Sequence, residues 1–265
     1  MSYTIVIPVY NKEETLYKAV NSALNQTLPP DEVLVVDDAS TDHSLLALEP
    51  FMDNPCLKLI QMPQNSGTAK VLNKALEHIN TPYFLQLDGD DWLEPVAGEK
   101  LVTALQKNQA AAFAYGNHML WEYNANLGLK PVKQLIQPPF NNKYDFLLKL
   151  GYMLNPRCYR TEYVRKLGGF DTDDPWEGRY YEDARMVIRL AEYYEWIHVP
   201  EILHNVLIDR KKSAQKIPMY NRLRKEFYEK MLQKWGNEYL PVWHTASTGR
   251  IILQALIPNP KRHNS

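Results

Sequence analysis

Residues 83–91 read Tyr83-Phe84-Leu85-Gln86-Leu87-Asp88-Gly89-Asp90-Asp91, an apolar run that ends in three carboxylates. A short apolar run bounded by turn residues is typical of a buried strand. Neighbouring carboxylates destabilise one another's charge unless a cation neutralises them. The alternatives are a solvated acidic turn or a cap for the helix expected after Pro95. The stretch therefore predicts a buried strand with a candidate cation site at its end.

Similar apolar runs alternate with helical patterns through about the first 110 residues, which is typical of βαβ units. The pattern predicts a Rossmann-like, mostly parallel central sheet with helices on both faces. The expected strands are Tyr3 to Ile7, Glu32 to Val36, Leu57 to Gln61 and Tyr83 to Leu87. The expected helices are Glu13 to Asn25, Ser44 to Met52, Thr68 to His78, and Pro95 to Asn108.

Polar residues follow each of these strands. They are Tyr10-Asn11, Asp37-Asp38, Asn65-Ser66-Gly67 and the acidic run that ends at Asp91. The carboxyl ends of parallel strands share one edge of a sheet, where open α/β sheets bind their ligands. The sequence therefore predicts one pocket built from four strand ends.

These motifs, in this order, resemble those of the family 2 glycosyltransferases with the GT-A fold. The resemblance is carried by residues 5–11, 23–27, 35–42, 65–67 and 87–91. It continues more thinly with Gly168-Gly169-Phe170-Asp171, Glu182-Asp183 with Arg189-Leu190, and Val199-Pro200-Glu201. The fold that it implies is GT-A, and the activity that it implies is inverting transfer of a sugar from a nucleotide-diphosphate sugar.

The resemblance implies a role for each residue of the donor pocket. Pro8, Tyr10 and Asp38 would line the nucleotide base, and Asn65 and Gly67 belong to the same pocket. Asp88 would face the ribose, while Asp90 would be the principal metal ligand and Asp91 a second or outer-shell partner. Hard cations such as Mn²⁺ or Mg²⁺ suit these oxygen ligands. Asp37 is interpreted as a cap of the turn at residues 40–42.

Glu182-Asp183 resembles the second acidic motif of the family. We expect Asp183 to be the catalytic base that deprotonates the acceptor hydroxyl, with Glu182 as its substitute. The alternative for Asp183 is a carboxylate at a helix N-terminus, which the helix dipole favours. The acidic turn at residues 171–177 is interpreted as exposed loop charges.

The chain departs from the family pattern in two places. Leu72 stands where many members have an arginine that helps to bind diphosphate, and Lys70 is a doubtful substitute. His204 lies near the position of a family metal ligand without the usual spacing, so no third ligand is assigned. Arg210, Lys211 and Lys212 are either a diphosphate-binding loop or a solvated charge run.

We expect three segments. Residues 1–110 bind the nucleotide sugar, and residues 111–210 supply acceptor binding and the base within the same domain. Residues 211–265 form a helical C-terminal extension, with helices over Tyr220 to Lys234 and Pro241 to Leu256. The prolines and aromatics of residues 121–140 are interpreted as a long loop.

Composition limits the partners. A net charge of −1 argues against a nucleic-acid footprint, and two cysteines without metal-ligand spacing favour a reducing compartment. The expected location is cytoplasmic, because neither a signal peptide nor a membrane-spanning run is found. Peripheral contact with the inner membrane face through residues 251–257, and a homodimer, both stay open.

The predicted function is therefore an inverting glycosyltransferase that uses a UDP-sugar and Mn²⁺ or Mg²⁺. Its acceptor would be a hydroxyl of a glycan, a lipid-linked sugar or a small molecule, in polysaccharide, glycolipid or cell-envelope glycan synthesis. Two alternatives stay open. One is a catalytically silent nucleotide-binding homologue, and the other is a sugar nucleotidyltransferase, although the latter needs a Gly-rich basic loop that residues 8–12 do not provide.

Overall fold

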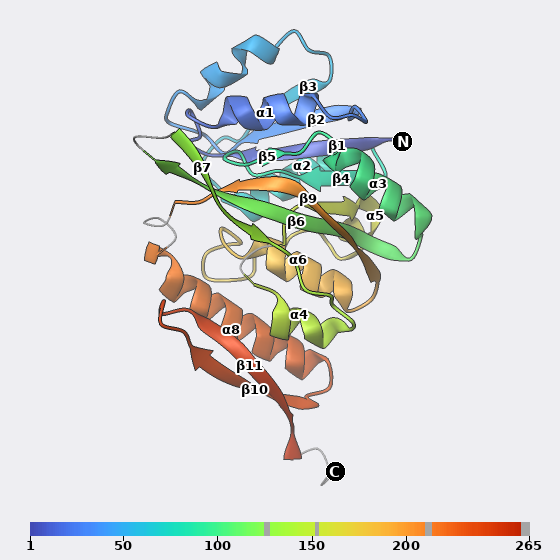
Figure 1. Ribbon diagram of the computed structural model, residues 1–265, viewed down its shortest axis with the longest axis vertical. Coiled ribbons are helices and arrows are strands. Elements are labelled where there is room, and N and C mark those ends of the chain that lie inside the picture. The colour runs from blue at the N-terminus through green and yellow to red at the C-terminus, as the bar shows by residue number, and fades with distance from the viewer. Residues whose placement is uncertain (125–127, 152–153, 210–213, 261–265) are drawn as a thin grey trace. The chain divides into compact units, whose positions relative to one another are not determined.

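The computed structural model describes residues 1–124, 128–151, 154–209 and 214–260 (Figure 1). These form two compact units. The first comprises Met1–Pro139 and Met153–Ile208, and the second comprises Phe140–Tyr152 and Asp209–Ser265. All of the predicted site residues fall in the first unit.

The first unit is an α/β domain built on one mixed sheet. Among the described residues the sheet has nine strands in the order β3-β2-β1-β4-β8-β6-β9-β5, with β7 paired to β6. The strands are β1 Tyr3–Val9, β2 Glu32–Asp37, β3 Leu57–Gln61, β4 Tyr83–Gln86, β5 Trp92–Leu93, β6 Ala111–Asn124, β7 Gly128–Leu135, β8 Arg157–Arg160 and β9 Glu195–Leu207. The helices are α1 Leu16–Leu24, α2 Thr68–His78, α3 Ala97–Lys107, α5 Thr161–Lys166 and α6 Glu182–Ala191, with the 3-10 helix η1 at Ser44–Phe51.

The strands of the predicted βαβ half are parallel, as expected. β2 pairs with β1 and β3, and β1 also pairs with β4, all in parallel. Beyond β4 the sheet becomes mixed, because β8 runs antiparallel to both β4 and β6. β8 thus joins the first half of the sheet to the second half, which contains the parallel pair β6 and β9.

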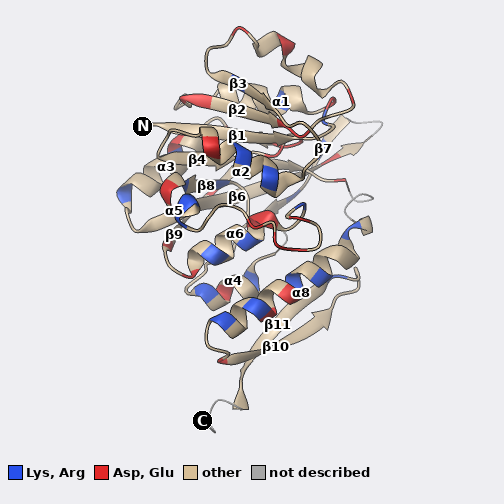
Figure 2. Cartoon of the chain, turned by 180° about the vertical axis from the view of Figure 1, so that it is seen from behind, with Lys and Arg blue, Asp and Glu red and all other residues tan. Residues whose placement is uncertain are grey.

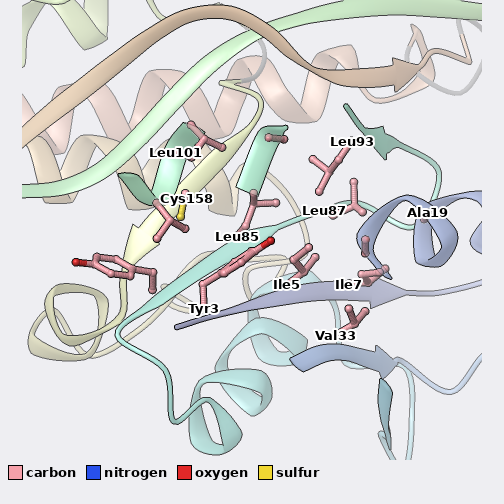
Figure 3. Packing of buried hydrophobic residues seen from close by; sticks show 14 of the residues in the cluster. Tyr3, Ile5, Ile7, Ala19, Val33, Leu85, Leu87, Leu93, Leu101 and Cys158 are labelled. Atoms are coloured by element: carbon pink, nitrogen blue, oxygen red, sulfur yellow. The ribbon is translucent and has the colours of Figure 1, made fainter. Parts of the chain in front are cut away.

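The core follows from the two-residue period of the strands. Ile5 and Ile7 of β1 and Val33 and Val35 of β2 are fully buried in one cluster with residues of α1 and α3 (Figure 3). Val6 points to the opposite face and is also fully buried. α2, whose Leu72 is buried, contacts β1 and β2 outside that cluster. Helices therefore cover both faces, as the near-continuous apolar strands require.

Two local expectations for this unit were wrong. The helix predicted at residues 44–52 is a 3-10 helix, and it contains Pro50, which cannot donate the backbone hydrogen bond of a continuing α-helix. The loop predicted at residues 121–140 contains most of the hairpin formed by β6 and β7. Pro131 lies in β7, an edge strand, where a missing amide donor is tolerated.

The second unit contains two helices and a β-hairpin. α4 spans Lys143–Lys149, and α8 spans Ile217–Lys234, close to the bounds predicted for the helix at residues 220–234. The helix predicted at residues 241–256 was wrong, because this segment forms the antiparallel strands β10 Tyr239–Thr245 and β11 Ile251–Pro258. The connecting turn ends at Gly249, whose φ of 79° lies in the left-handed region that favours glycine. Peripheral membrane contact through residues 251–257 stays a prediction, and these residues belong to a strand rather than to a helix.

None of the helices in the described ranges combines the length and the apolar character that crossing a bilayer requires.

Gly98 allows α3 to approach β1 closely. A Cβ at residue 98 would lie 2.1 Å from the hydroxyl oxygen of Tyr3, which donates a 2.6 Å hydrogen bond to the carbonyl of Leu28. We expect Gly98→Ala to lower the free energy of unfolding by about 1–3 kcal/mol through overpacking, measured by urea denaturation. Gly151→Ala, where nothing lies within 4 Å, is the matched control. Equal stability of the two variants would contradict this packing.

Candidate active site at the carboxyl edge of the sheet

The polar residues that follow the strands contact one another, as predicted. After β1, the backbone N–H of Asn11 donates to the hydroxyl of Ser40 at 3.0 Å, and the amide oxygen of Asn11 accepts from the N–H of Thr41 at 2.8 Å. Thr15, at the start of α1, donates its hydroxyl to the carbonyl of Gly89 at 2.9 Å. The ends of β1, β2 and β4 are therefore joined by direct hydrogen bonds.

Asp37 and Asp38 have different roles at the end of β2. Asp37 accepts from the backbone N–H of Ser40 through both carboxylate oxygens, at 3.3 and 3.2 Å, which is the turn cap that was predicted. Asp38 accepts from the N–H of Ser66 at 2.6 Å and from that of Gly67 at 2.8 Å. Asp38 thus fixes the turn between β3 and α2, and each of its oxygens retains a second lone pair for a ligand.

The other predicted pocket residues lie at the same edge. Tyr10 is 43% exposed, so its ring is accessible to a stacking partner, and Pro8 is partly buried at the end of β1. The carbonyl oxygen of Asn65 accepts from Nη2 of Arg179 at 2.9 Å. A Cβ at Gly67 would meet the side chain of Arg179 at 2.4 Å, and φ at Gly67 is 91°. Only glycine fits there, because the arginine crosses the turn.

The acidic motif after β4 contains one ion pair that the sequence did not reveal. The ammonium of Lys12 pairs with the carboxylate of Asp90. Burial lowers the pKa of Lys12, but the charges of Asp90, Asp88 and Asp91 outweigh it and raise that pKa overall. Burial also raises the pKa of Asp88, with the charge of Asp90 adding to it and that of Arg157 opposing it.

Asp91 is buried and faces away from that ion pair. Its Oδ2 lies 2.9 Å from Nε2 of His204, and its Oδ1 accepts from the backbone N–H of Leu207 at 3.0 Å. Burial raises the pKa of Asp91 and lowers that of His204. Both oxygens of Asp91 accept hydrogen bonds within the protein, so Asp91 anchors the acidic loop on β9, and its role as a second or outer-shell metal partner stays a prediction.

The donor set suits a hard divalent cation at Asp90. Its carboxylate is 35% exposed and already attracts a cationic group, the ammonium of Lys12. Mg²⁺ and similar ions need only one or two protein carboxylates when substrate phosphates complete the coordination shell. Within the described ranges, no cluster of three or more potential ligand side chains is found. The residues present therefore fit a cation that is shared with a phosphate ligand.

The second acidic motif, Glu182-Asp183, opens α6. Oδ2 of Asp183 accepts from Nη1 of Arg157 at 2.9 Å, and Oδ1 accepts from the N–H of Ala184 at 2.7 Å. Arg157 is buried in β8, and its Nη1 also donates to Oδ1 of Asn155 at 2.5 Å. The side chain of Asp183 stays 16% exposed, so it can still reach a substrate.

Arg157 acts on both acidic motifs. Burial lowers its pKa, but the charges of Asp183 and Asp88 outweigh this effect and raise it. Glu182 responds differently: burial, together with the charges of Asp183 and Asp88, raises its pKa to about 8. At neutral pH, Glu182 is therefore mostly protonated. The two acidic motifs, which lie almost a hundred residues apart in the sequence, form one electrostatic unit around a single guanidinium.

Acidic residues gather in the segment before α6, and basic residues lie on α6 itself (Figure 2). Ion pairs between them hold the segment in place. Arg185 of α6 pairs with Asp171 at 3.2 Å, with Asp174 at 2.5 Å, and with Asp173. Arg189 pairs with Asp171 at 2.7 Å. The prediction of exposed loop charges is confirmed for Asp173 and Glu177 but wrong for Asp171 and Asp174, which are largely covered. The two helix arginines neutralise the loop and thereby fix the entry to α6.

Sequence reasoning missed Arg157 and Lys12. β8 has the sequence Arg-Cys-Tyr-Arg, so no apolar run marked Arg157 as a buried charge. Lys12 carried no signal either, because a lysine after a strand is usually solvated. Lys70 pairs with Glu177, which supports the doubt about its role at a diphosphate. Arg210, Lys211 and Lys212 lie outside the described residues.

An α/β sheet with acidic motifs at one edge defines a nucleotide-binding class of fold, and solved structures make the class specific. The chain superposes on the mannosyltransferase PcManGT from Pyrobaculum calidifontis with a TM-score of 0.66, at 19% identity over 87% of this chain and 64% of that one. It superposes on TarS from S. aureus, residues 1–349, with a TM-score of 0.62, at 20% identity over 82% of this chain and 63% of that one. The fold is GT-A, as the sequence resemblance implied.

The family model "Glycosyl transferase family 2" matches residues 4–167. This chain belongs to the family 2 glycosyltransferases. It is 36% identical over 216 residues to chondroitin synthase of Pasteurella multocida, covering 80% of this chain and 21% of that protein. It is 27% identical over 240 residues to hyaluronan synthase of Pasteurella multocida, covering 89% of this chain and 24% of that protein. The chain thus spans about a quarter or less of the length of these two relatives.

The contribution of Arg157 can be measured with a double-mutant cycle. We expect Arg157→Met to lower the free energy of unfolding by about 3–5 kcal/mol, because it leaves buried carboxylates without their counter-charge. Combining it with Asp183→Asn should recover part of that loss, since one of the unpaired charges is then removed. Urea denaturation of both single variants and the double variant gives the coupling energy. Strictly additive effects would rule out the Arg157–Asp183 coupling.

The raised pKa of Glu182 predicts a pH-dependent stability. The unfolded carboxyl releases its proton near its ordinary pKa of 4.5, whereas the folded one keeps it up to about pH 8. The stabilisation is complete below the lower value and is lost as pH rises through the higher one. Glu182→Gln cannot ionise at residue 182. The difference in melting temperature between this variant and the wild type should therefore shift in favour of the variant as pH rises from about 5 to about 9, measured in EDTA. A constant difference would contradict the shifted pKa.

Proposed function

We propose that this chain transfers a sugar from a nucleotide-diphosphate sugar, most simply a UDP-sugar, to an acceptor hydroxyl with inversion at the anomeric carbon. One observation carries the proposal: the buried guanidinium of Arg157 donates to Asp183, and the charge of Asp88 acts on the same guanidinium. A donor-side carboxylate and a candidate base thus belong to the same site. Such proximity is what a single displacement between two bound substrates requires.

The donor would lie across the strand ends. Tyr10 is exposed enough to stack on the base, and Asp38 keeps free lone pairs that can accept an imide N–H. Pro8, Asn65 and Gly67 complete the pocket, and Asp88 would meet the ribose. The solved structure of TarS in complex with UDP supports a UDP donor, whereas that of PcManGT with GDP-Man and Mn²⁺ supports GDP as the alternative.

A divalent cation, Mn²⁺ or Mg²⁺, would be held by Asp90 together with the donor's diphosphate, and Asp91 would fix the loop through His204. When bound, such a cation stabilises the charge that develops on the leaving diphosphate. The protein itself supplies the base. Asp183, oriented by Arg157 through Oδ2, takes the proton of the acceptor hydroxyl on the face of the sugar opposite the leaving nucleotide.

We infer a glycan acceptor, because relatives named chondroitin synthase and hyaluronan synthase match most of this chain. A lipid-linked or small-molecule hydroxyl is the alternative. The sugar nucleotidyltransferase is disfavoured by the connection from β1 to α1, where Lys12 pairs with a carboxylate and no Gly-rich phosphate loop is present. The silent homologue is disfavoured because both acidic motifs are kept and brought together.

A transfer assay with Asp183→Asn tests the proposal. The variant should still bind UDP or GDP with Mn²⁺, seen as a rise in melting temperature, because the base does not contact the nucleotide. Its turnover should fall by about 10²–10⁴-fold, because general-base catalysis is lost. NMR of the first-formed product should show inverted configuration. Wild-type turnover in the variant would exclude Asp183 as base, and retained configuration would exclude single displacement.

A further inference from the structure

The backbone of Lys12 is held by hydrogen bonds, whereas its side chain is long and partly exposed. Its backbone N–H donates to the hydroxyl of Ser44 at 2.6 Å, and its carbonyl accepts from the N–H groups of Thr15 at 3.0 Å and Leu16 at 2.9 Å. Its stem passes over Gly89, where an added Cβ would lie 3.3 Å from Cγ of Lys12. The absence of a side chain at Gly89 therefore gives the lysine its path to the acidic motif.

The ammonium of Lys12 pairs with Asp90, and the charges of Asp88 and Asp91 also act on it. The side chains of Lys12 and Asp90 are 30% and 35% exposed. The ion pair thus marks a position that a cation can occupy. Because the pair is partly exposed, a cation from solvent can take the place of the ammonium.

We propose that Lys12 is an internal counter-ion that competes with the divalent cation for Asp90, and that it transfers to the donor's diphosphate when the cation binds. Only the second step, the transfer of the ammonium to the diphosphate, rests on the proposed function. A dication on Asp90 repels a neighbouring ammonium, so the lysine leaves that carboxylate. The diphosphate that shares the cation brings negative charge within reach of a four-carbon stem. A lysine ammonium binds phosphate as a point charge.

The other described basic groups near the strand ends are engaged elsewhere. Lys70 pairs with Glu177, and Arg179 donates to Asn65. Arg157 is buried and pairs with Asp183, and the charge of Asp88 acts on it. Leu72, where many family members have an arginine, is buried. Lys12 therefore supplies the positive charge that this chain lacks at residue 72.

The first experiment measures Mn²⁺ affinity without nucleotide, by titration calorimetry on the wild type, Lys12→Met and Lys58→Met. Lys58 is the matched control because it also pairs with a carboxylate, that of Glu32, and lies at the opposite end of the parallel strands. Removing the competitor should tighten Mn²⁺ binding about tenfold in Lys12→Met and leave it unchanged in Lys58→Met. Unchanged or weaker Mn²⁺ binding by Lys12→Met overturns the competition.

The second experiment measures the affinity of UDP and of GDP in saturating Mn²⁺. Lys12→Met should weaken binding of the accepted nucleotide about tenfold, and Lys12→Arg should restore most of it. Equal affinity in wild type and Lys12→Met overturns the transfer to diphosphate. If the wild type binds neither nucleotide, the proposed function and this transfer both fail, whereas the Mn²⁺ titration still judges the competition for Asp90 by itself.

Discussion

The hydrogen-bonded ion pair between Arg157 and Asp183 is the constraint on which the site depends. A guanidinium buried in the middle of a sheet is tolerated only if carboxylates compensate its charge. β8 places it between β4, which leads to Asp88, and β6, which lies beside the strand that carries His204. Satisfying one buried charge therefore requires the donor motif and the base motif to come together. Few alternative arrangements of α6 on the sheet could do so.

Charge balance then explains how the pocket is organised. Asp88 and Asp90 on the donor side face Lys12, while Asp183 on the acceptor side faces Arg157, and Glu182 avoids an additional charge by keeping its proton at neutral pH. Each side of the site has one cationic partner. The two partners differ in kind: Arg157 is buried and fixed, whereas Lys12 is partly exposed and can be exchanged. The fixed guanidinium of Arg157 is suited to orienting the proposed base. The exchangeable ammonium of Lys12 is suited to a site that would bind a metal ion and a diphosphate.

The surrounding loops make this arrangement rigid through hydrogen bonds rather than through apolar packing. Asp38 fixes the turn at Ser66 and Gly67, and Arg179 ties the segment before α6 to that same turn. Arg185 anchors that segment from the opposite side. The proposed base is thus connected to the proposed nucleotide pocket through these hydrogen bonds and ion pairs, which limits how far either can shift without the other.

The sequence by itself determined the parallel half of the sheet, because apolar runs with helical patterns between them have few ways to be buried, and strand ends must share an edge. It also determined where the two acidic motifs lie, because a group of carboxylates can be recognised from neighbouring residues alone. It could not determine that residues 241–256 form a hairpin, because the apolar residues of this segment fit the spacing of a helix as well as that of a strand. The turn at Gly249 and the pairing of the two strands determine which one forms. Nor could it show that Asp91 turns to His204, or that Lys12 and Arg157 divide the carboxylates between them. Those contacts depend on which charged residues the fold brings close together. The strength of a Coulomb interaction depends on distance in space and not on separation along the chain.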